Sequence, residues 1–317
     1  MDWLEKMEYV TLKNSDLRVS RLCMGGCPMG GYGWGEVQEH ELVDAVHAAL
    51  DNGINFFDTA DTYGLGQSEK TLGKALGGRR DQAVIASKFG VRTGPNGTYY
   101  DNTPEWIIEA CDKSLQRLGT DHIDLYQIHY RDGKTELSAV VDAMEYLRSQ
   151  GKIRYFGLSN LKAADIPEFV PFKGKFASVQ NHYSLACRDF EEDILALSEQ
   201  MALTPMTWGS LGQGILTGKY GRDVSFGSND RRSRAIYTNF FGEKLEKNLD
   251  IVDAMRPIAA EHGKPLSALA VRFILDRLPD SVVLCGAKRP EQILSSAEAM
   301  DWKLSSEELK TLELISR

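Results

Sequence analysis

The sequence has no long apolar run. No stretch of about 18 consecutive apolar residues, the length that spans a membrane, occurs in the 317-residue chain. The first residues, MDWLEKM, are too acidic and too interrupted to form the apolar part of a secretion signal. We therefore expect a cytoplasmic protein that does not insert into a membrane.

Basic residues are outnumbered by acidic ones. The chain has 37 lysine and arginine residues against 45 aspartate and glutamate residues, a formal net charge of -8. Nucleic-acid binding draws most of its affinity from clustered cations, so this balance disfavours DNA or RNA as a partner. A small molecule is the expected partner.

Cysteines are few, odd in number and widely spaced, and no two of them form a CxxC pair. This pattern disfavours both a disulfide framework and a structural zinc site. We expect reduced thiols and no bound metal. The five are Cys23, Cys27, Cys111, Cys187 and Cys285.

Short apolar or β-branched runs alternate with longer amphipathic stretches along the whole chain. Such alternation is typical of repeated βα units. The pattern predicts eight strands, at residues 21–25, 54–59, 83–88, 122–129, 154–159, 177–181, 203–208 and 282–286.

Helices are expected between these strands, for example at residues 39–52, 103–118 and 136–150, where apolar residues recur every three or four positions. Pro104 after Thr103 is typical of a helix start, and Gly53 after Asn52 of a helix stop. Eight parallel strands with helical crossovers predict an α/β fold, a closed (β/α)8 TIM barrel made by residues 1–317 as one domain.

Two segments stand outside the repeated units. Residues 8–19 contain two short strand-like pieces around Asn14-Ser15-Asp16, which predicts an N-terminal β-hairpin that plugs the barrel bottom. Residues 219–239 form an irregular stretch longer than an ordinary βα connection. Because it follows the seventh strand, we expect it to cover the barrel mouth.

Polar residues close three consecutive predicted strands. Asp58, Lys88 and His129 end the second, third and fourth strands, and Tyr63 follows Asp58 in the next loop. A structural ion pair of Asp58 with Lys88, an exposed turn tyrosine and a satisfied histidine would be the ordinary explanation. Barrels of this kind carry their catalytic groups at the C-terminal ends of the strands, however, so we expect the four side chains to form an active site.

These four residue types suit the reduction of a carbonyl group. Hydride addition to carbon builds negative charge on oxygen, which needs a proton donor. Tyr63 is protonated at neutral pH, and an ammonium group at Lys88 would favour its phenolate form. Asp58 would hold Lys88 charged, and His129 would donate to the carbonyl oxygen.

The same segments resemble the aldo-keto reductase superfamily, and the likeness covers nearly the whole chain. INFFDTADTYGLGQSE resembles the family segment with the catalytic Asp and Tyr, SKFG the segment with the catalytic Lys, and DHIDLYQIH the segment with the catalytic His. The resemblance implies a barrel with an N-terminal hairpin that binds NADPH (NADP+) and reduces aldehydes and ketones. The implied catalytic residues are Asp58, Tyr63, Lys88 and His129.

The resemblance also implies a cofactor site. Ser159, Asn160 and Gln180 would contact the carboxamide of the nicotinamide, Trp208 would stack on its ring, and Lys288 would meet the 2′-phosphate. Basic residues at that end favour NADPH over NADH. The other implied cofactor-binding residues are Gly26, Cys27, Asp58, Gly209, Ser210, Leu211, Gly212, Lys219, Arg234, Gly286, Gln292 and Ser296.

Three local features depart from simple patterns. The chain reads Gly209-Ser210-Leu211 where relatives often read Ser-Pro-Leu, and Ser295-Ser296 where they often read Glu-Asn. The glycine-rich residues 30–35 lack the spacing of a dinucleotide-binding loop. We expect a substrate-pocket loop there, with Tyr32 and Trp34 as walls.

An alternative function remains open at this stage. The chain is also similar to potassium-channel beta subunits, which implies as the alternative a redox-sensing or regulatory subunit that binds the cofactor with little turnover. We expect an enzyme that acts as a monomer on a small carbonyl substrate, which the sequence does not identify.

Overall fold

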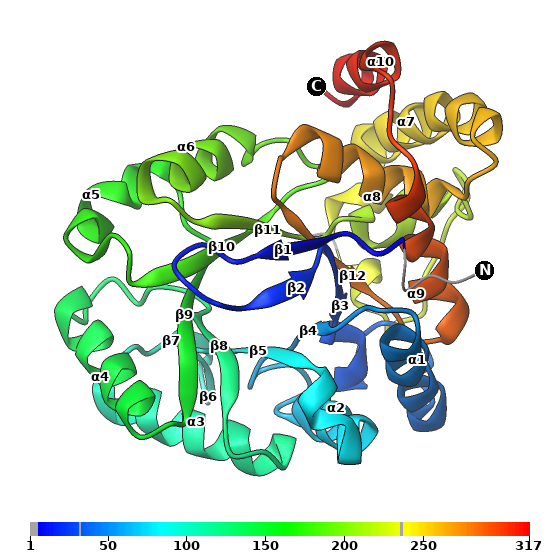
Figure 1. Cartoon of the computed structure of the whole chain (residues 1–317). Helices are drawn as coiled ribbons and strands as arrows, with labels where there is room; N and C mark the ends of the chain where they lie inside the picture. Colours follow the sequence, from blue (N-terminus) through cyan, green and yellow to red (C-terminus); the bar gives the residue numbers. More distant parts are fainter. Residues whose placement is uncertain (1–5, 32, 235–236) are drawn as a thin grey trace.

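The computed structural model describes residues 6–31, 33–234 and 237–317. Eight parallel strands form a closed barrel, as predicted (Figure 1). Going round the barrel, the strands are β3 (Leu22–Gly25), β4 (Phe56–Asp58), β5 (Val84–Phe89), β8 (Ile123–Ile128), β9 (Ile153–Ser159), β10 (Phe176–His182), β11 (Thr204–Trp208) and β12 (Val282–Gly286).

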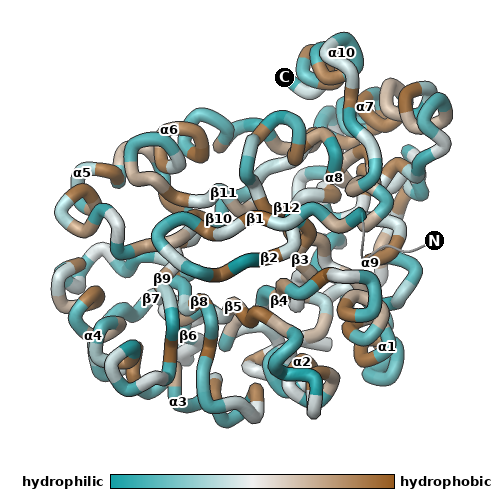
Figure 2. The backbone as a smooth tube through the Cα atoms, viewed as in Figure 1, coloured by the Kyte–Doolittle hydropathy of each residue, from teal (hydrophilic) through white to brown (hydrophobic). Residues whose placement is uncertain are grey.

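Helices surround the barrel (Figure 1). Along the helices of Figure 2, brown apolar segments alternate with teal polar ones, because each helix buries one face against the strands or against neighbouring helices. The helices are α1 (Glu39–Asp51), α2 (Gln67–Leu76), α3 (Pro104–Leu118), α4 (Leu137–Ser149), α5 (Ile166–Phe169), α6 (Glu191–Met201), α7 (Gly242–Glu261), α8 (Leu266–Arg277), α9 (Pro290–Ala297) and α10 (Ser306–Ser316). In the parts of the chain that the structure describes, none of them is long and apolar enough to cross a membrane.

The predicted helix boundaries are confirmed. Helix α3 begins at Pro104 after the extended Thr103, and α1 ends at Asp51, just before Gly53. Gly53 has a φ of 80°, a conformation that favours glycine. Short 3-10 helices occupy several loops, at Cys27–Gly30, Gly77–Gln82, Ala163–Asp165, Val170–Phe172, Gly212–Thr217, Arg231–Ser233, Thr238–Phe240 and Glu298–Asp301.

The barrel interior is apolar in its lower part and polar at its upper rim. Phe56, Ala86 and Leu125 belong to one buried cluster inside the barrel. Two residues further along the same strands come Asp58, Lys88 and Gln127, which are also buried. Successive side chains of a strand point to opposite faces, so residues two apart share the interior face. The polar set therefore forms a layer above the apolar one.

The N-terminal hairpin closes the bottom of the barrel, as predicted. Strands β1 (Tyr9–Thr11) and β2 (Arg18–Ser20) pair antiparallel and cross the barrel end that faces the viewer in Figure 1. Leu12, Leu17 and Val19 of this hairpin are buried in the same cluster as the lower interior residues of the barrel. The bottom is thus sealed by apolar packing.

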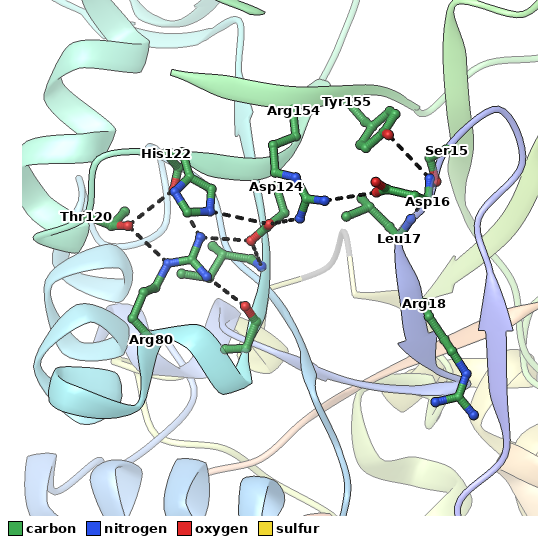
Figure 3. Close-up of polar contacts among 12 residues, drawn as sticks. Ser15, Asp16, Leu17, Arg18, Arg80, Thr120, His122, Asp124, Arg154 and Tyr155 are labelled. Carbon is green, nitrogen blue, oxygen red and sulfur yellow. Dashed lines mark hydrogen bonds and ion pairs between the residues drawn. The ribbon is translucent and has the colours of Figure 1, made fainter. Parts of the chain in front are cut away.

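Asp124 anchors this closed end. Its carboxylate accepts hydrogen bonds from Arg80 (2.8 Å), from Arg154 (2.8 Å) and from the backbone N–H of Ile85 (2.9 Å), as Figure 3 shows in part. Arg154 also pairs with Asp16 on the hairpin (2.9 Å). The buried carboxylate of Asp124 therefore connects the hairpin to the barrel through Arg154.

A second hairpin was not predicted. Strands β6 (Val91–Gly94) and β7 (Gly97–Tyr100) pair antiparallel between β5 and α3. All four residues of β7 are exposed, so the segment lacks the alternation of buried and exposed residues that marks a strand in a sequence.

We predict that Asp124→Asn destabilises the protein. The amide keeps the size of the carboxylate but leaves Arg80 and Arg154 without their shared negative charge. We expect the free energy of unfolding to fall by about 2 kcal/mol, less than for a fully buried pair because the Arg154 side chain is 41% exposed. Urea unfolding followed by circular dichroism measures this change. Asp81→Asn, at an exposed position that lines a surface cavity together with Asp124, serves as the control. Equal losses in both variants would contradict this role.

Candidate active site

A cavity of about 760 Å³ opens at the C-terminal ends of the barrel strands. Its lining includes the last residues of several strands, among them Gly25, Asp58, Ser159, Trp208 and Gly286. Most of the site residues predicted from the sequence line it. They are Gly26, Cys27, Asp58, Tyr63, His129, Ser159, Asn160, Gln180, Trp208, Gly209, Ser210, Leu211, Lys219, Gly286, Lys288 and Gln292.

The Asp58 carboxylate is the centre of the polar layer beneath this cavity. Asp58 Oδ1 accepts a hydrogen bond from Lys88 Nζ at 2.5 Å. Asp58 Oδ2 accepts from Gln127 Nε2 at 3.0 Å and from Gln180 Nε2 at 2.8 Å. The three donors come from β5, β8 and β10, so one carboxylate joins side chains from four strands.

Gln127 was missed in the sequence analysis. It lies two residues before His129, on the interior face of β8, and it is fully buried. A glutamine on the interior face of a strand, two residues after the apolar Leu125, was a visible signal, because buried polar groups need partners. The pattern gave no indication that the partner would be Asp58.

The hydrogen bond between Lys88 and Tyr63 has a defined direction. Lys88 Nζ lies 3.4 Å from the Tyr63 hydroxyl oxygen and also donates to the backbone oxygen of Thr59 at 3.1 Å. An ammonium group can only donate, so the Tyr63 oxygen accepts this hydrogen bond. The hydroxyl proton of Tyr63 must then point elsewhere, and Tyr63 lines the cavity.

The pKa of Tyr63 departs from the expectation that Lys88 would favour the phenolate. Burial, followed by the Asp58 carboxylate, raises the pKa of Tyr63 well above its usual value. The Lys88 ammonium is paired with Asp58, which offsets its charge. Tyr63 is therefore a neutral phenol at physiological pH.

His129 is neutral as well. Burial, and secondarily the positive charge of Lys88, lowers the pKa of His129 well below its usual value. Its ring lies edge-on to the ring of Tyr63, with 6.0 Å between the centroids. Its Nδ1 is buried and has no hydrogen-bond partner among the described residues. An uncharged imidazole thus borders the cavity beside the ring of Tyr63.

Asn160 organises the next part of the rim. Its Nδ2 donates to the backbone oxygen of His129 and to Ser159 Oγ, both at 3.1 Å, and its Oδ1 accepts from Trp208 Nε1 at 3.1 Å. The φ of Asn160 is 57°, a left-handed conformation that asparagine tolerates better than most residues. Asn160 therefore connects the loop after β8 with the indole at the end of β11.

Trp208 has one ring face covered by protein. The His182 ring stacks on it with 4.1 Å between centroids and 7° between planes. Gly209 follows at a φ of 69°, and a Cβ at this position would lie 2.5 Å from the His182 ring. The departure from Ser-Pro-Leu thus has a steric reason, because a larger residue at 209 would displace His182.

Cations gather at the far end of the cavity. Lys219, Arg231, Arg232, Lys288 and Arg289 all line it. Burial, and then the charges of Arg232, Lys219 and Arg289, lower the pKa of Lys288. This mutual repulsion favours the binding of an anion.

The loop with Gly33 and Trp34 and the segment with Arg231 meet over the cavity. The backbone N–H of Arg231 donates to the oxygen of Gly33 at 2.9 Å, and Lys288 Nζ donates to the oxygen of Trp34 at 2.8 Å. Trp34 and residues 219, 220, 231, 232 and 237 line the cavity, in agreement with the mouth position expected for both loops. Tyr32 lies outside the described residues.

Three predicted cofactor residues do not line the cavity. Gly212 is buried, Ser296 is buried with its hydroxyl on the Gln292 backbone oxygen (3.2 Å), and Arg234 is exposed. Ser295, Arg231 and Arg232 line the cavity instead. Lys88 lies beneath the cavity floor rather than on it.

The chain matches the model of the aldo/keto reductase family over residues 21–317. It belongs to this family. It is 34% identical to the aldo-keto reductase YhdN of Bacillus subtilis over 98% of this chain and 93% of that protein. It is 31% identical to the NADH-specific methylglyoxal reductase of Escherichia coli over 94% and 95% of the two chains.

Solved structures agree with this assignment. The glycerol dehydrogenase AKR11B4 from Gluconobacter oxydans superposes with a TM-score of 0.87 at 34% identity, covering 97% of this chain and 94% of that one. An aldo/keto reductase from Klebsiella pneumoniae in complex with NADP and acetate superposes with a TM-score of 0.77 at 28% identity, covering 98% and 95%. The protein is an oxidoreductase of a family that uses nicotinamide cofactors.

In the described part of the chain, no group of three or more His, Cys, Asp or Glu residues could hold a metal ion.

The Tyr63 loop itself contains a carboxyl group, that of Asp61, which the sequence did not single out. Asp61 Oδ1 is buried without a hydrogen-bond partner among the described residues. Burial, followed by the charge of Glu69, raises the pKa of Asp61 to about 7, although Arg117 opposes the shift. The folded state therefore binds a proton here more tightly than the unfolded chain, where an aspartate has a pKa near 3.9.

We predict that Asp61→Asn stabilises the protein in a pH-dependent way. Because the folded pKa of Asp61 is raised, its ionisation costs stability progressively as the pH rises from about 4 to about 7. The melting temperature of Asp61→Asn should exceed that of the native protein by several degrees at pH 8 and by much less at pH 4.5. Asp44→Asn, at an exposed position on α1, is the control. A difference that does not grow with pH would exclude this explanation.

Proposed function

We propose that the protein is an NADPH-dependent reductase that converts aldehydes or ketones to alcohols, with Tyr63 as the proton donor. The observation that supports this proposal most directly is the direction of the hydrogen bond between Lys88 and Tyr63. Lys88 Nζ lies 3.4 Å from the Tyr63 oxygen as a donor, which leaves the phenolic proton for a group in the cavity. The whole of residues 1–317 would act as one catalytic domain.

The side chains lining the cavity fit a nicotinamide dinucleotide. Lys219, Arg232 and Lys288 concentrate positive charge where phosphates would be neutralised. At the other end, Ser159, Asn160 and Gln180 offer polar groups for the carboxamide. Trp208 lines the cavity while His182 covers one of its faces, which leaves the other for an aromatic ring. When bound, NADPH supplies the hydride that reduces the carbonyl carbon.

The protein's own part in the reaction is proton delivery. The neutral His129 ring would orient the carbonyl oxygen toward Tyr63, whose hydroxyl then donates its proton to that oxygen. The resulting phenolate would be stabilised by Lys88, which already points at the Tyr63 oxygen. Asp58 keeps Lys88 in place, and Gln127 and Gln180 hold Asp58.

The preference for NADPH rests on charge. Lys288 is partly buried and lies near three other cations, so an additional phosphate group would relieve their repulsion. One relative is named as NADH-specific, so membership of the family does not decide the cofactor. The cationic end of this cavity favours NADPH.

We predict that Tyr63→Phe separates binding from turnover. The phenyl ring keeps the shape of the side chain but has no proton to give, so kcat should fall by about 100- to 10,000-fold while NADPH binding changes little. Steady-state kinetics and fluorescence titration with NADPH measure the two effects. Tyr146→Phe, at a half-exposed position on α4, is the control. Unchanged turnover in Tyr63→Phe would refute the mechanism. Tight NADPH binding by a native protein that turns over no aldehyde would favour a regulatory subunit.

We predict that Lys288→Met weakens NADPH binding more than NADH binding. The methionine keeps the apolar length of the side chain but removes the charge, so the Kd for NADPH should rise by about tenfold, the effect of one lost phosphate contact. The Kd for NADH should change less than threefold. Calorimetric titration of both cofactors gives the ratio. Lys303→Met, at an exposed position before α10, is the control. An equal loss for both cofactors would place Lys288 away from the 2′-phosphate.

A further inference from the structure

Three aromatic rings form a row that runs from the site to the surface. The rings of His129 and Tyr130 stack with 5.1 Å between centroids and 27° between planes. The rings of Tyr130 and Tyr100 stack with 4.9 Å between centroids and 17° between planes. His129 and Tyr130 line the cavity, whereas Tyr100 lies on β7 and is 45% exposed.

Hydrogen bonds connect the end of the β6–β7 hairpin to the backbone around Tyr130. Asn102, which is fully buried, donates from Nδ2 to the backbone oxygen of Tyr130 at 3.1 Å. Its Oδ1 accepts from the backbone N–H of Asp132 at 2.9 Å, and its own backbone N–H donates to the Asp132 carboxylate at 2.9 Å. At the hairpin base, Asp101 N–H donates to the oxygen of Gly90 at 3.0 Å. These hydrogen bonds fix the backbone next to Tyr100 relative to the backbone of Tyr130, and so keep the two rings stacked.

The wall around Tyr130 is aromatic. Burial raises the pKa of Tyr130, and Tyr100 and Tyr237 raise it further. Tyr237 in turn lies edge-on to Trp34, with 6.2 Å between centroids, and both line the cavity. Flat apolar groups pack well against aromatic rings, through stacked or edge-on contacts.

We propose that Tyr100 is a positioning residue that fixes the ring of Tyr130, and that Tyr130 thereby favours carbonyl substrates that carry a flat apolar group. This proposal rests on the proposed function, because it concerns the substrate of the same site. Tyr100 itself does not line the cavity and acts only through Tyr130. Losing the Tyr100 ring would free the Tyr130 ring to change its orientation, and a substrate too small to reach Tyr130 would be unaffected.

The experiment compares Tyr100→Ala with Tyr99→Ala. The two tyrosines are adjacent in β7 and equally exposed, at 45%, but the Tyr99 ring contacts Arg92 rather than Tyr130. Kinetics with NADPH are measured for benzaldehyde and for acetaldehyde. The affinity of the unreactive benzamide is measured by calorimetry on the protein with and without NADP+. Melting temperatures establish that each variant is folded.

We expect Tyr100→Ala to raise the KM for benzaldehyde and the Kd for benzamide by about fivefold, the effect of one aromatic contact. Its kcat and its constants for acetaldehyde should stay within about twofold. Tyr100→Phe, which keeps the stacked ring, and Tyr99→Ala should both behave as the native protein.

Equal effects of Tyr100→Ala and Tyr99→Ala on benzamide binding would overturn the proposal, as would an equal loss for both aldehydes. A native protein that reduces neither aldehyde but binds benzamide in a Tyr100-dependent way would overturn the proposed function while supporting the positioning role of Tyr100.

Discussion

The buried contact between Asp58 and Lys88 is the constraint on which the site depends. The two side chains are 2% and 0% exposed, so each charge has lost its hydration and relies on protein groups. Lys88 donates to Asp58, to the backbone of Thr59 and to Tyr63, and the second oxygen of Asp58 takes two glutamine amides. A lysine held by these contacts keeps a donor directed at the Tyr63 oxygen, so the phenolic proton of Tyr63 is directed away from Lys88.

The alternation of side chains along the strands explains why this polar layer lies directly above an apolar core. Phe56 precedes Asp58, Ala86 precedes Lys88 and Leu125 precedes Gln127 by two residues each. The lower residues pack against the hairpin plug, which excludes water from below. The upper residues can then hold charge only because they satisfy one another. The same three strands therefore supply an apolar layer that stabilises the fold and, directly above it, the polar layer of the site.

The sequence predicted the barrel strands and the polar residues at their ends better than it predicted the loops. Short apolar or β-branched runs marked all eight barrel strands, and Asp58, Lys88 and His129 were identified because ionisable residues at strand ends are unusual. Gln127 was overlooked because a single amide gives no sign of its partner. In residues 219–239, the family resemblance pointed to Arg234, whereas Arg231 and Arg232 line the cavity. An irregular segment has no periodicity that shows which side chain turns inward.

The mouth of the barrel is shaped by contacts between loops that are remote in sequence. Lys288 holds the backbone of Trp34, Gly33 pairs with the segment at Asp230, and Asn102 holds the backbone of Tyr130. Each contact fixes the backbone of a loop whose side chains line the cavity, through a residue from another loop. In the proposed function, the reaction chemistry would come from the side chains at the strand ends. Under the same proposal, the choice of substrate would depend on these cross-loop contacts, which only the three-dimensional structure brings together.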